Sequence, residues 1–193
     1  MNAYILVGGR SRRMGASKTE LFLDRVVAAA SPVFDEVLAV NRHDAEPLPI
    51  RTIFEDPHEG EGALFGIARA LEDAHGKCFV IAVDYPLVTT EVLQFLALQF
   101  EECPAAALVP EWDGHPQPLC AGWDAGAMLP LVERRLARGD CELRALIAEA
   151  GAAMMPEREL RARFPGEPLM NVNTPEELEA AEKLYEREEG SNE

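Results

Sequence analysis

The sequence has no apolar run close to the roughly 20 residues that a membrane-spanning helix needs, so we expect no membrane partner. Its opening residues, MNAYILVGG, lack both the cationic start and the long apolar stretch of a signal peptide. The 4 cysteines lie far apart and none belongs to a C-x-x-C pair, which argues against a zinc site or a disulfide framework. Together these absences predict a cytoplasmic protein with reduced thiols.

Positive charge is also scarce. The chain has 18 lysines and arginines against 34 aspartates and glutamates, for a formal net charge of −16. A nucleic acid would have to overcome this general repulsion, and no second basic stripe appears downstream of the N-terminal region, so we expect no nucleic-acid partner. The 193 residues show no internal repeat and no break in composition, which predicts a single domain over residues 1–193 with an acidic tail, about residues 186–193, that frays.

Short apolar runs alternate with segments of helical periodicity along the chain. The expected strands are Ala3–Val7, Glu36–Asn41, Arg51–Glu55, Cys78–Val83, Ala105–Pro110, Pro118–Gly122 and Leu169–Asn173. The expected helices are Thr19–Ala30, Ala63–Ala74, Thr90–Phe100, Ala125–Ala137, Glu142–Ala150 and Pro175–Glu188. The first and fourth apolar runs are nearly continuous, as in parallel strands that are buried on both faces. The alternation predicts an α/β fold with a mainly parallel central sheet and helices on both faces.

Two local features complete this picture. The last helix has a clear start, because Thr174 suits the N-cap and Glu177, three residues later, completes a capping box. Lys77 follows Gly76 and is expected in an exposed turn before a strand.

The stretch ILVGGRSRRMGASK, from Ile5 to Lys18, is the most informative part of the chain. Four cations, Arg10, Arg12, Arg13 and Lys18, fall within nine residues with no acid between them. An apolar strand leads into them through two adjacent glycines, which let backbone N–H groups turn toward a ligand. On so acidic a protein, this concentration of positive charge points to an anion site, most simply for a polyphosphate.

A solvated surface run is the alternative interpretation of this cluster. Neither of two common phosphate-binding patterns is present. The Walker pattern requires Gly-Lys-Ser/Thr, whereas Ala16 and Ser17 separate Gly15 from Lys18, and the chain has no G-x-G-x-x-G. The residues alone favour a phosphate-binding loop without excluding a surface run.

Asp84 is the most telling residue beyond the basic loop. Ligands of doubly wound sheets bind outside the carboxyl ends of the strands, and Asp84 follows the most apolar run. A carboxylate there is poorly placed unless it is hydrated, hydrogen-bonded or bound to a cation. A Mg²⁺ that is shared with substrate phosphates takes only one or two protein carboxylates, so a single Asp can suffice. Both Asp84-Tyr85-Pro86 and Glu55-Asp56-Pro57 are also ordinary turn sequences, which leaves a structural role open.

These motifs together resemble a known family. The segment GGRSRRMGASK fits the signature G-G-x-S-x-R-M-G-x-x-K of nucleotidyltransferases that activate cofactors and sugars. The segment NVNTPEEL, from Asn171 to Leu178, and the Gly-Gly pair resemble the molybdenum cofactor guanylyltransferase family. Further matching segments are Asn41-Arg42, Glu55-Asp56, Asp84-x-Pro86 and Gln117-Pro118-Leu119, so the resemblance runs from about residue 5 to residue 178.

The resemblance implies a Rossmann-like nucleotidyltransferase fold and an enzyme that transfers GMP from GTP to the terminal phosphate of molybdopterin, or of its molybdenum-loaded form, releasing pyrophosphate. Its implied cofactor is Mg²⁺ on Asp84, and its implied protein partners belong to molybdenum cofactor biosynthesis and delivery. The implied catalytic residues are Arg13, Lys18 and Asp84. The implied nucleotide-binding residues are Leu6, Val7, Gly8, Gly9, Lys18, Asn41, Asp56 and Asp84. The implied acceptor-binding residues are Gln117, Asn171 and Asn173.

The chain departs from the family pattern in two places near these residues. The Gly-Lys-Pro loop that usually follows the phosphate lysine is shortened after Lys18, and the G-P-L-x-G segment reads Gly62-Ala63-Leu64-Phe65-Gly66. Neither departure removes a residue that is assigned to the chemistry.

Two other functions remain as alternatives. One is a sister transferase that uses CTP with molybdopterin, or GTP with another small phosphorylated acceptor. The other is a non-catalytic nucleotide-binding module, against which Lys18 and Asp84 both stand. An attacking phosphate is already ionised at neutral pH and needs no general base, so we expect the histidines to be surface or loop residues.

Overall fold

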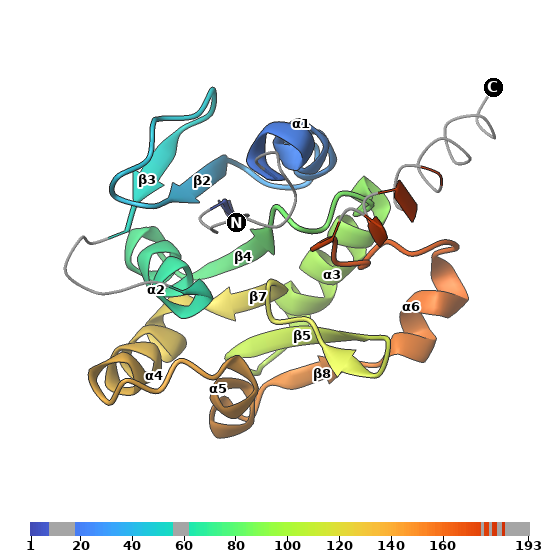
Figure 1. Ribbon diagram of the computed structural model, residues 1–193. Helices are drawn as coiled ribbons and strands as arrows, with labels where there is room; N and C mark the ends of the chain where they lie inside the picture. The colour runs from blue at the N-terminus through green and yellow to red at the C-terminus, as the bar shows by residue number, and fades with distance from the viewer. Residues whose placement is uncertain (8–17, 56–61, 175, 178, 181–182, 184–193) are drawn as a thin grey trace.

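A mixed sheet forms the centre of the molecule in the computed structural model, which describes residues 1–7, 18–55, 62–174, 176–177, 179–180 and 183 (Figure 1). The sheet has 8 strands in the order β3-β2-β1-β4-β7-β5-β6, and β8 also pairs with β5. The strands are β1 (Ala3–Leu6), β2 (Val37–Asn41), β3 (Thr52–Phe54), β4 (Lys77–Ala82), β5 (Ala107–Trp112), β6 (His115–Pro116), β7 (Cys120–Asp124) and β8 (Ala153–Met155). The helices are α1 (Lys18–Ala30), α2 (Ala63–Asp73), α3 (Thr90–Glu102), α4 (Ala125–Ala137), α5 (Leu143–Ala150) and α6 (Glu157–Arg163).

The four strands β3, β2, β1 and β4 are parallel and form the core of the sheet. Ile5 of β1 lies opposite Ala39 of β2 on one side and Ile81 of β4 on the other. All three residues are completely buried, as the nearly continuous apolar runs predict. The central expectation of a parallel α/β sheet is confirmed for this half.

The other half of the sheet is largely antiparallel. Strand β7 lies between β4 and β5 and is antiparallel to both, and β6 is antiparallel to β5. Asp113 and Gly114, with φ of 49° and 70°, turn the chain between β5 and β6, and a connection this short can join only antiparallel strands. The parallel pair β5–β8 closes this half.

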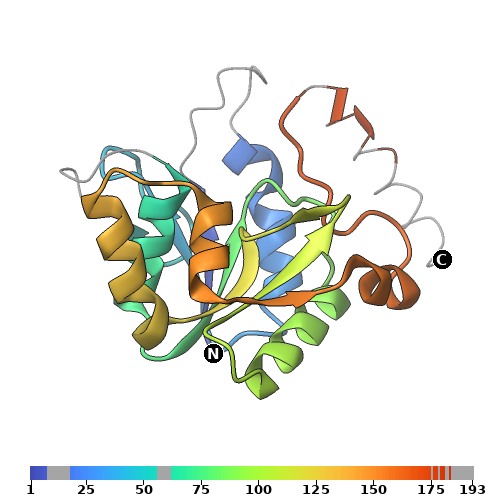
Figure 2. The ribbon, with the colours of Figure 1, turned by 90° about the horizontal axis from the view of Figure 1, so that it is seen from below.

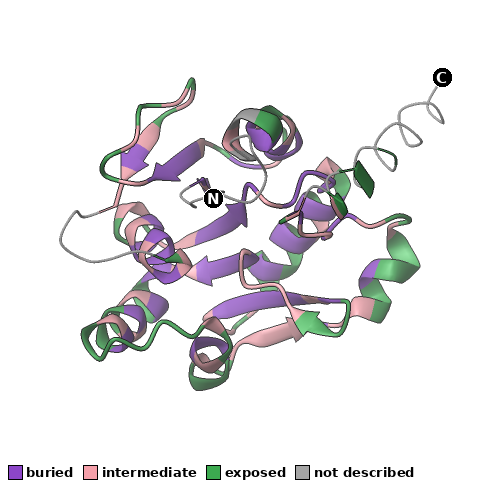
Figure 3. Ribbon diagram, viewed as in Figure 1, coloured by how far each residue is buried: buried purple, intermediate pink, exposed green. Residues whose placement is uncertain are grey.

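Helices cover both faces of the sheet, as expected (Figure 2). Helices α1, α3 and α6 pack on one face through Val26, Leu93 and Leu160. Helices α2, α4 and α5 pack on the other face, where Ile67 and Val132 are completely buried. Buried residues therefore concentrate on the central strands and on the inner sides of the helices (Figure 3).

Close packing between the sheet and α3 depends on a glycine. A Cβ at Gly122 of β7 would lie 2.3 Å from a ring carbon of Phe100, so no side chain fits there without movement of the helix. No helix in the described part of the chain is both long and apolar enough to cross a bilayer.

Three local expectations can be compared with the structure. The expected strand Leu169–Asn173 is wrong: this segment is irregular, although Leu169 and Val172 are buried. Strands β6 and β8 and helix α6 had not been expected. The expected capping box is confirmed, because the Glu177 amide donates to Thr174 Oγ1 at 3.2 Å and the Thr174 amide donates to Glu177 Oε2 at 3.0 Å.

The expectation for Lys77 is also wrong. Lys77 begins β4, and its Nζ donates to the carbonyl oxygens of Phe100, Glu101 and Cys103 at 2.7, 3.0 and 2.9 Å. These carbonyls lie at the C-terminal end of α3, where a cation satisfies groups that the helix leaves without partners. Lys77 is therefore a helix-capping residue.

Candidate functional site

Those predicted site residues that the structure describes lie along one edge of the sheet, at or beyond the carboxyl ends of the parallel strands. Backbone hydrogen bonds join these ends, because the Val7 amide donates to Val40 O at 3.1 Å and the Val83 amide donates to Leu6 O at 3.0 Å. The start of α1, the connection after β6 and the segment 169–174 lie along the same edge (Figure 2). Four strands therefore bring residues from distant parts of the chain to one place.

Both ends of the basic segment are fixed at this edge. The hydroxyl of Thr19 donates to the carbonyl oxygen of Val7 at 3.3 Å, which joins the first turn of α1 to the end of β1. Helix α1 begins at Lys18, so the amide groups of its first turn and the positive end of its dipole lie at this edge. Gly8, Gly9, Arg13 and the side chain of Lys18 lie outside the described residues.

Gly66 of α2 packs closely against Leu6 at the end of β1. A Cβ at Gly66 would lie 3.3 Å from both Leu6 Cδ2 and Glu55 Oε1, so the absence of a side chain lets α2 approach the end of β1. Leu6 is half-buried and Val7 is buried. This close approach places the backbone of Leu6 and Val7, two predicted nucleotide contacts, beside the start of α2.

Asn41 is buried at the end of β2, and both ends of its amide bond the backbone. Its Nδ2 donates to Glu46 O at 3.3 Å, and its Oδ1 accepts from the Arg42 amide at 2.9 Å. The Glu55 amide also donates to the Asn41 carbonyl oxygen at 2.9 Å. The side chain therefore shapes the loop after β2. Asp56, another predicted nucleotide contact, lies outside the described residues.

Asp84 is half-buried just beyond β4, in the turn that Tyr85 and Pro86 continue. Its carbonyl oxygen accepts from the Val172 amide at 2.9 Å. Among the described residues there is no group of three or more His, Cys, Asp or Glu side chains that could hold a metal ion. Asp84 alone fits a hard cation that takes its other ligands from phosphate oxygens and water.

Two of the three predicted acceptor residues, Gln117 and Asn171, contact Tyr85, which the sequence interpretation had not assigned to the site, and the third, Asn173, contacts Asn171. The Tyr85 hydroxyl donates to Gln117 Oε1 at 3.0 Å and is also hydrogen-bonded by the Asn171 side chain. Asn173 Nδ2 donates to Asn171 Oδ1 at 2.8 Å. Burial, and to a smaller extent Cys120 and Asp84, raise the pKa of Tyr85, so the phenol remains protonated.

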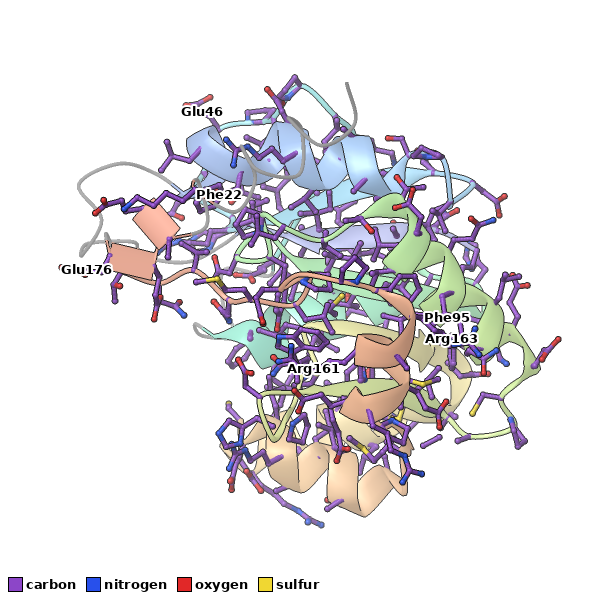
Figure 4. All side chains as sticks on the ribbon, turned by 90° about the vertical axis from the view of Figure 1, so that its right-hand side faces the viewer. Phe22, Glu46, Phe95, Arg161, Arg163 and Glu176 are labelled. Atoms are coloured by element: carbon purple, nitrogen blue, oxygen red, sulfur yellow. The ribbon has the colours of Figure 1, made fainter. Side chains whose placement is uncertain are left out.

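The β5–β6 hairpin beside Gln117 is anchored to α6. Arg161, labelled in Figure 4, has its guanidinium carbon 4.0 Å from the ring centre of Trp112. It also pairs with Glu157, Glu167 and Asp113 at 2.7, 3.1 and 3.1 Å. On the other side of the hairpin, Arg144 contacts His115 Nδ1 at 3.2 Å. The histidine is exposed, as expected.

Known proteins share this fold. The structure of 2-C-methyl-D-erythritol 4-phosphate cytidylyltransferase from Thermus thermophilus aligns over 95% of this chain and 97% of its own, with a TM-score of 0.65 at 18% identity, which shows a common fold. The family model and the sequence relatives described next define a nucleotidyltransferase, and so an enzyme. Residues 3–154 match the MobA-like NTP transferase domain, and the chain belongs to that family.

Similarity to individual members extends over nearly the whole chain. A probable molybdenum cofactor guanylyltransferase of Chloroflexus aggregans is 32% identical, over 92% of this chain and 91% of its own. Another, of Pelotomaculum thermopropionicum, is 32% identical over 94% and 92%. The structure of molybdopterin-guanine dinucleotide biosynthesis protein A from Archaeoglobus fulgidus aligns with a TM-score of 0.83 at 29% identity, over 97% of this chain and all of that one. The resemblance drawn from the motifs is thereby confirmed.

Proposed function

We propose that this enzyme transfers GMP from GTP to the terminal phosphate of molybdopterin, or of molybdenum-loaded molybdopterin, and releases pyrophosphate. The observation that carries the proposal is the 32% identity, over more than nine-tenths of both chains, to relatives named as molybdenum cofactor guanylyltransferases. The edge where β1, β2 and β4 end supports it, because the carboxyl ends of parallel strands are where such sheets bind ligands.

GTP binds between the end of β1 and the start of α2 in this proposal. The backbone of Leu6, Val7, Gly8 and Gly9 contacts the guanine and ribose, and Asn41 and Asp56 complete the nucleotide side. Asn41 acts mainly by holding the loop after β2, because both ends of its amide bond that loop. Arg13 and Lys18 neutralise the triphosphate, assisted by the positive end of α1.

A divalent metal ion fits Asp84, with Mg²⁺ as our choice, because a half-buried carboxylate beside a phosphate site offers the hard oxygen ligand that this ion prefers. When bound, the ion supplies further charge neutralisation on the phosphates. The acceptor approaches from the side of Gln117, Asn171 and Asn173.

The reaction requires little general acid–base catalysis from the protein. An oxygen of the acceptor phosphate forms a bond to the α-phosphorus of GTP, and the bond from that phosphorus to the bridging oxygen breaks. The electron pair leaves on pyrophosphate. Because the attacking oxygen is already ionised at neutral pH, the residues of the site act by in-line positioning and by offsetting the repulsion between two anions.

Pyrophosphate release from each of the four nucleoside triphosphates, with and without molybdopterin, tests the proposal. We expect release that requires both GTP and molybdopterin. Preference for CTP would identify a cytidylyl enzyme on the same fold. Release from GTP only with a different phosphorylated acceptor would change the substrate, and nucleotide binding without release would identify a binding module.

A further inference from the structure

We propose that Tyr85 is a positioning residue for the acceptor, because its buried hydroxyl fixes the side chains of Gln117 and Asn171, and Asn171 in turn holds Asn173. This inference rests on the proposed function for the identity of the acceptor. It goes beyond that function by dividing the acceptor side into one outer contact, Asn173, and three residues that hold it.

The orientation of the Gln117 amide is the first step. Its Nε2 donates to Trp112 O at 3.0 Å and to His115 O at 3.1 Å, so both hydrogens of the amide are used on the β5–β6 hairpin. Its Oε1 must then face the other way, toward Tyr85. Since Oε1 can only accept, the Tyr85 hydroxyl has to donate, as the 3.0 Å contact indicates.

The orientation of Asn171 follows from that of Tyr85. A phenol that donates to Gln117 can only accept from Asn171, which therefore presents Nδ2 to the hydroxyl. Its Oδ1 turns away and accepts from Asn173 Nδ2 at 2.8 Å. The hydrogen bonds of the four side chains thus all point the same way from donor to acceptor: from Asn173 to Asn171, then to Tyr85, Gln117 and the hairpin. We call this chain of hydrogen bonds the relay.

A backbone hydrogen bond ties the relay to Asp84, the proposed metal ligand. Val172 lies between the two asparagines and is completely buried, and its amide donates to the Asp84 carbonyl oxygen at 2.9 Å. The Asn173 amide donates to Glu177 Oε2 at 2.6 Å, in the capping box of the last helix. Asn173 is exposed, whereas Tyr85 is only 1% exposed, so the relay runs from the protein interior to the edge of the site.

The arrangement separates residues that touch the acceptor from residues that act through others. Gln117 directs its amide to the hairpin and to Tyr85, and Asn171 directs its amide to Tyr85 and Asn173. Removing the hydroxyl would leave Gln117 Oε1 and Asn171 Nδ2 without their central partner, and both amides could then rotate. The acceptor phosphate would meet a less ordered Asn173.

Tyr85→Phe tests this role, and Tyr4→Phe is its matched control. Tyr4 is also completely buried, and its hydroxyl donates one hydrogen bond, to Asp73 Oδ2 at 3.0 Å, on the other face of the sheet. For Tyr85→Phe we expect KM for molybdopterin to rise on the order of threefold to tenfold while KM for GTP stays within about twofold. Tyr4→Phe should change neither KM. Hydrogen exchange at the Val172 amide should accelerate in Tyr85→Phe only.

A second variant tests the same hydrogen bond in case Tyr85→Phe fails to fold. Gln117→Leu removes the acceptor of the Tyr85 hydroxyl but leaves Tyr85 in place, and should give the same rise in KM for molybdopterin. On an Asn171→Ala background, Tyr85→Phe should add little, because the relay is already broken. Full additivity of the two changes, or identical kinetics for the Tyr85→Phe and Tyr4→Phe proteins, would overturn the inference.

The proposed function and this inference can fail separately. A wild-type protein that releases no pyrophosphate with molybdopterin refutes the proposed acceptor. In that case the exchange rate at Val172 decides the positioning role: acceleration in Tyr85→Phe supports it, and an unchanged rate refutes it.

Discussion

The amide of Val172 donates a 2.9 Å hydrogen bond to the carbonyl oxygen of Asp84, across 88 positions of sequence (172 − 84). This bond joins the irregular segment that follows α6 to the turn that carries the proposed metal ligand. The two halves of the proposed site, one for the triphosphate and one for the acceptor, are therefore held together by the backbone itself. Substitution of the Asp84 side chain leaves this backbone bond intact, so its effect on activity reports on the carboxylate.

Asp84→Asn keeps the shape of the side chain and removes its charge. We expect turnover to fall by about 10²–10³, or about 3–4 kcal/mol, because the electrostatic help is greatest as charge develops in the transition state. Binding of GTP should weaken much less. Steady-state pyrophosphate release and GTP titration measure the two quantities. Asp35→Asn is the control, since Asp35 is 81% exposed and pairs with the N-terminal amine. Near wild-type turnover in Asp84→Asn would show that Asp84 is only a turn residue.

Lys18→Ala should weaken both triphosphate binding and turnover. Lys18 begins α1 at the end of the basic segment, where a cation can meet phosphate oxygens. Lys183→Ala is the control, because Lys183 is 65% exposed and its pair with the similarly exposed Glu179 adds little to stability. If both variants bind GTP like the wild type, the basic segment is a solvated surface run.

GTP with Mg²⁺ should protect the fold against heat more than CTP does. A ligand at 100 times its dissociation constant adds about 2.7 kcal/mol of apparent stability, provided that it binds only the folded protein. The shift in Tm, measured at equal concentrations of the two nucleotides, reports the preference for the base. Equal shifts would contradict the guanine assignment and favour a cytidylyl enzyme.

Gly122→Ala should destabilise the fold by about 1–3 kcal/mol or more, because its Cβ would lie 2.3 Å from the Phe100 ring. Urea unfolding measures the change. Gly126→Ala, in the first turn of α4, is the matched control: its Cβ would make an ordinary 3.5 Å contact with Asp124 Oδ1. Combining Gly122→Ala with Phe100→Leu should recover part of the loss. Equal stability of the two alanine variants would mean that α3 can shift freely on the sheet.

The carboxylate of Glu157 gives the fold a pH dependence. The Arg161 guanidinium, and next the Gly114 amide, lower the pKa of Glu157 below its ordinary value of 4.5. A lowered folded-state pKa means that the stabilisation is present above pH 4.5 and is lost as the pH falls through the folded-state value. The Tm of wild type should therefore exceed that of Glu157→Gln at pH 7, and the difference should shrink below pH 4.5. Glu133→Gln, on the exposed side of α4, controls for the loss of one charge. A difference that is constant with pH would contradict this role.

The parallel core and most helices follow directly from the sequence. Long apolar runs and helical periodicity report burial, and burial on both faces of β1 and β4 is what a doubly covered sheet requires. The same signal fails at Leu169–Asn173, because Leu169 and Val172 are buried beneath the Asp84 turn without pairing to a strand. Apolar residues alone do not distinguish a strand from a buried irregular segment.

Helix α6 and strand β8, which the sequence analysis did not predict, have weak sequence signals. Helix α6 has only Leu160 buried, so its sequence shows no apolar period, and β8 is three residues long. The Asp113-Gly114 pair between β5 and β6 is a strong hairpin signal that the sequence interpretation did not use. Within the candidate site, the motifs identified Asp84, Gln117 and the asparagines, but not Tyr85, since the meeting of four side chains depends on tertiary packing.

The late position of β7 in the sequence delays the completion of the sheet during synthesis of the protein. Its five residues, Cys120–Asp124, form the hydrogen-bonded neighbour of β4 on the side away from β1. While the chain is being synthesised, β4 therefore has an open edge until β7 has emerged from the ribosome, although α3 and β5 are already outside. An unpaired edge on so apolar a strand is a template for intermolecular pairing. The interval before β7 arrives is thus the period when the nascent chain is most exposed to aggregation.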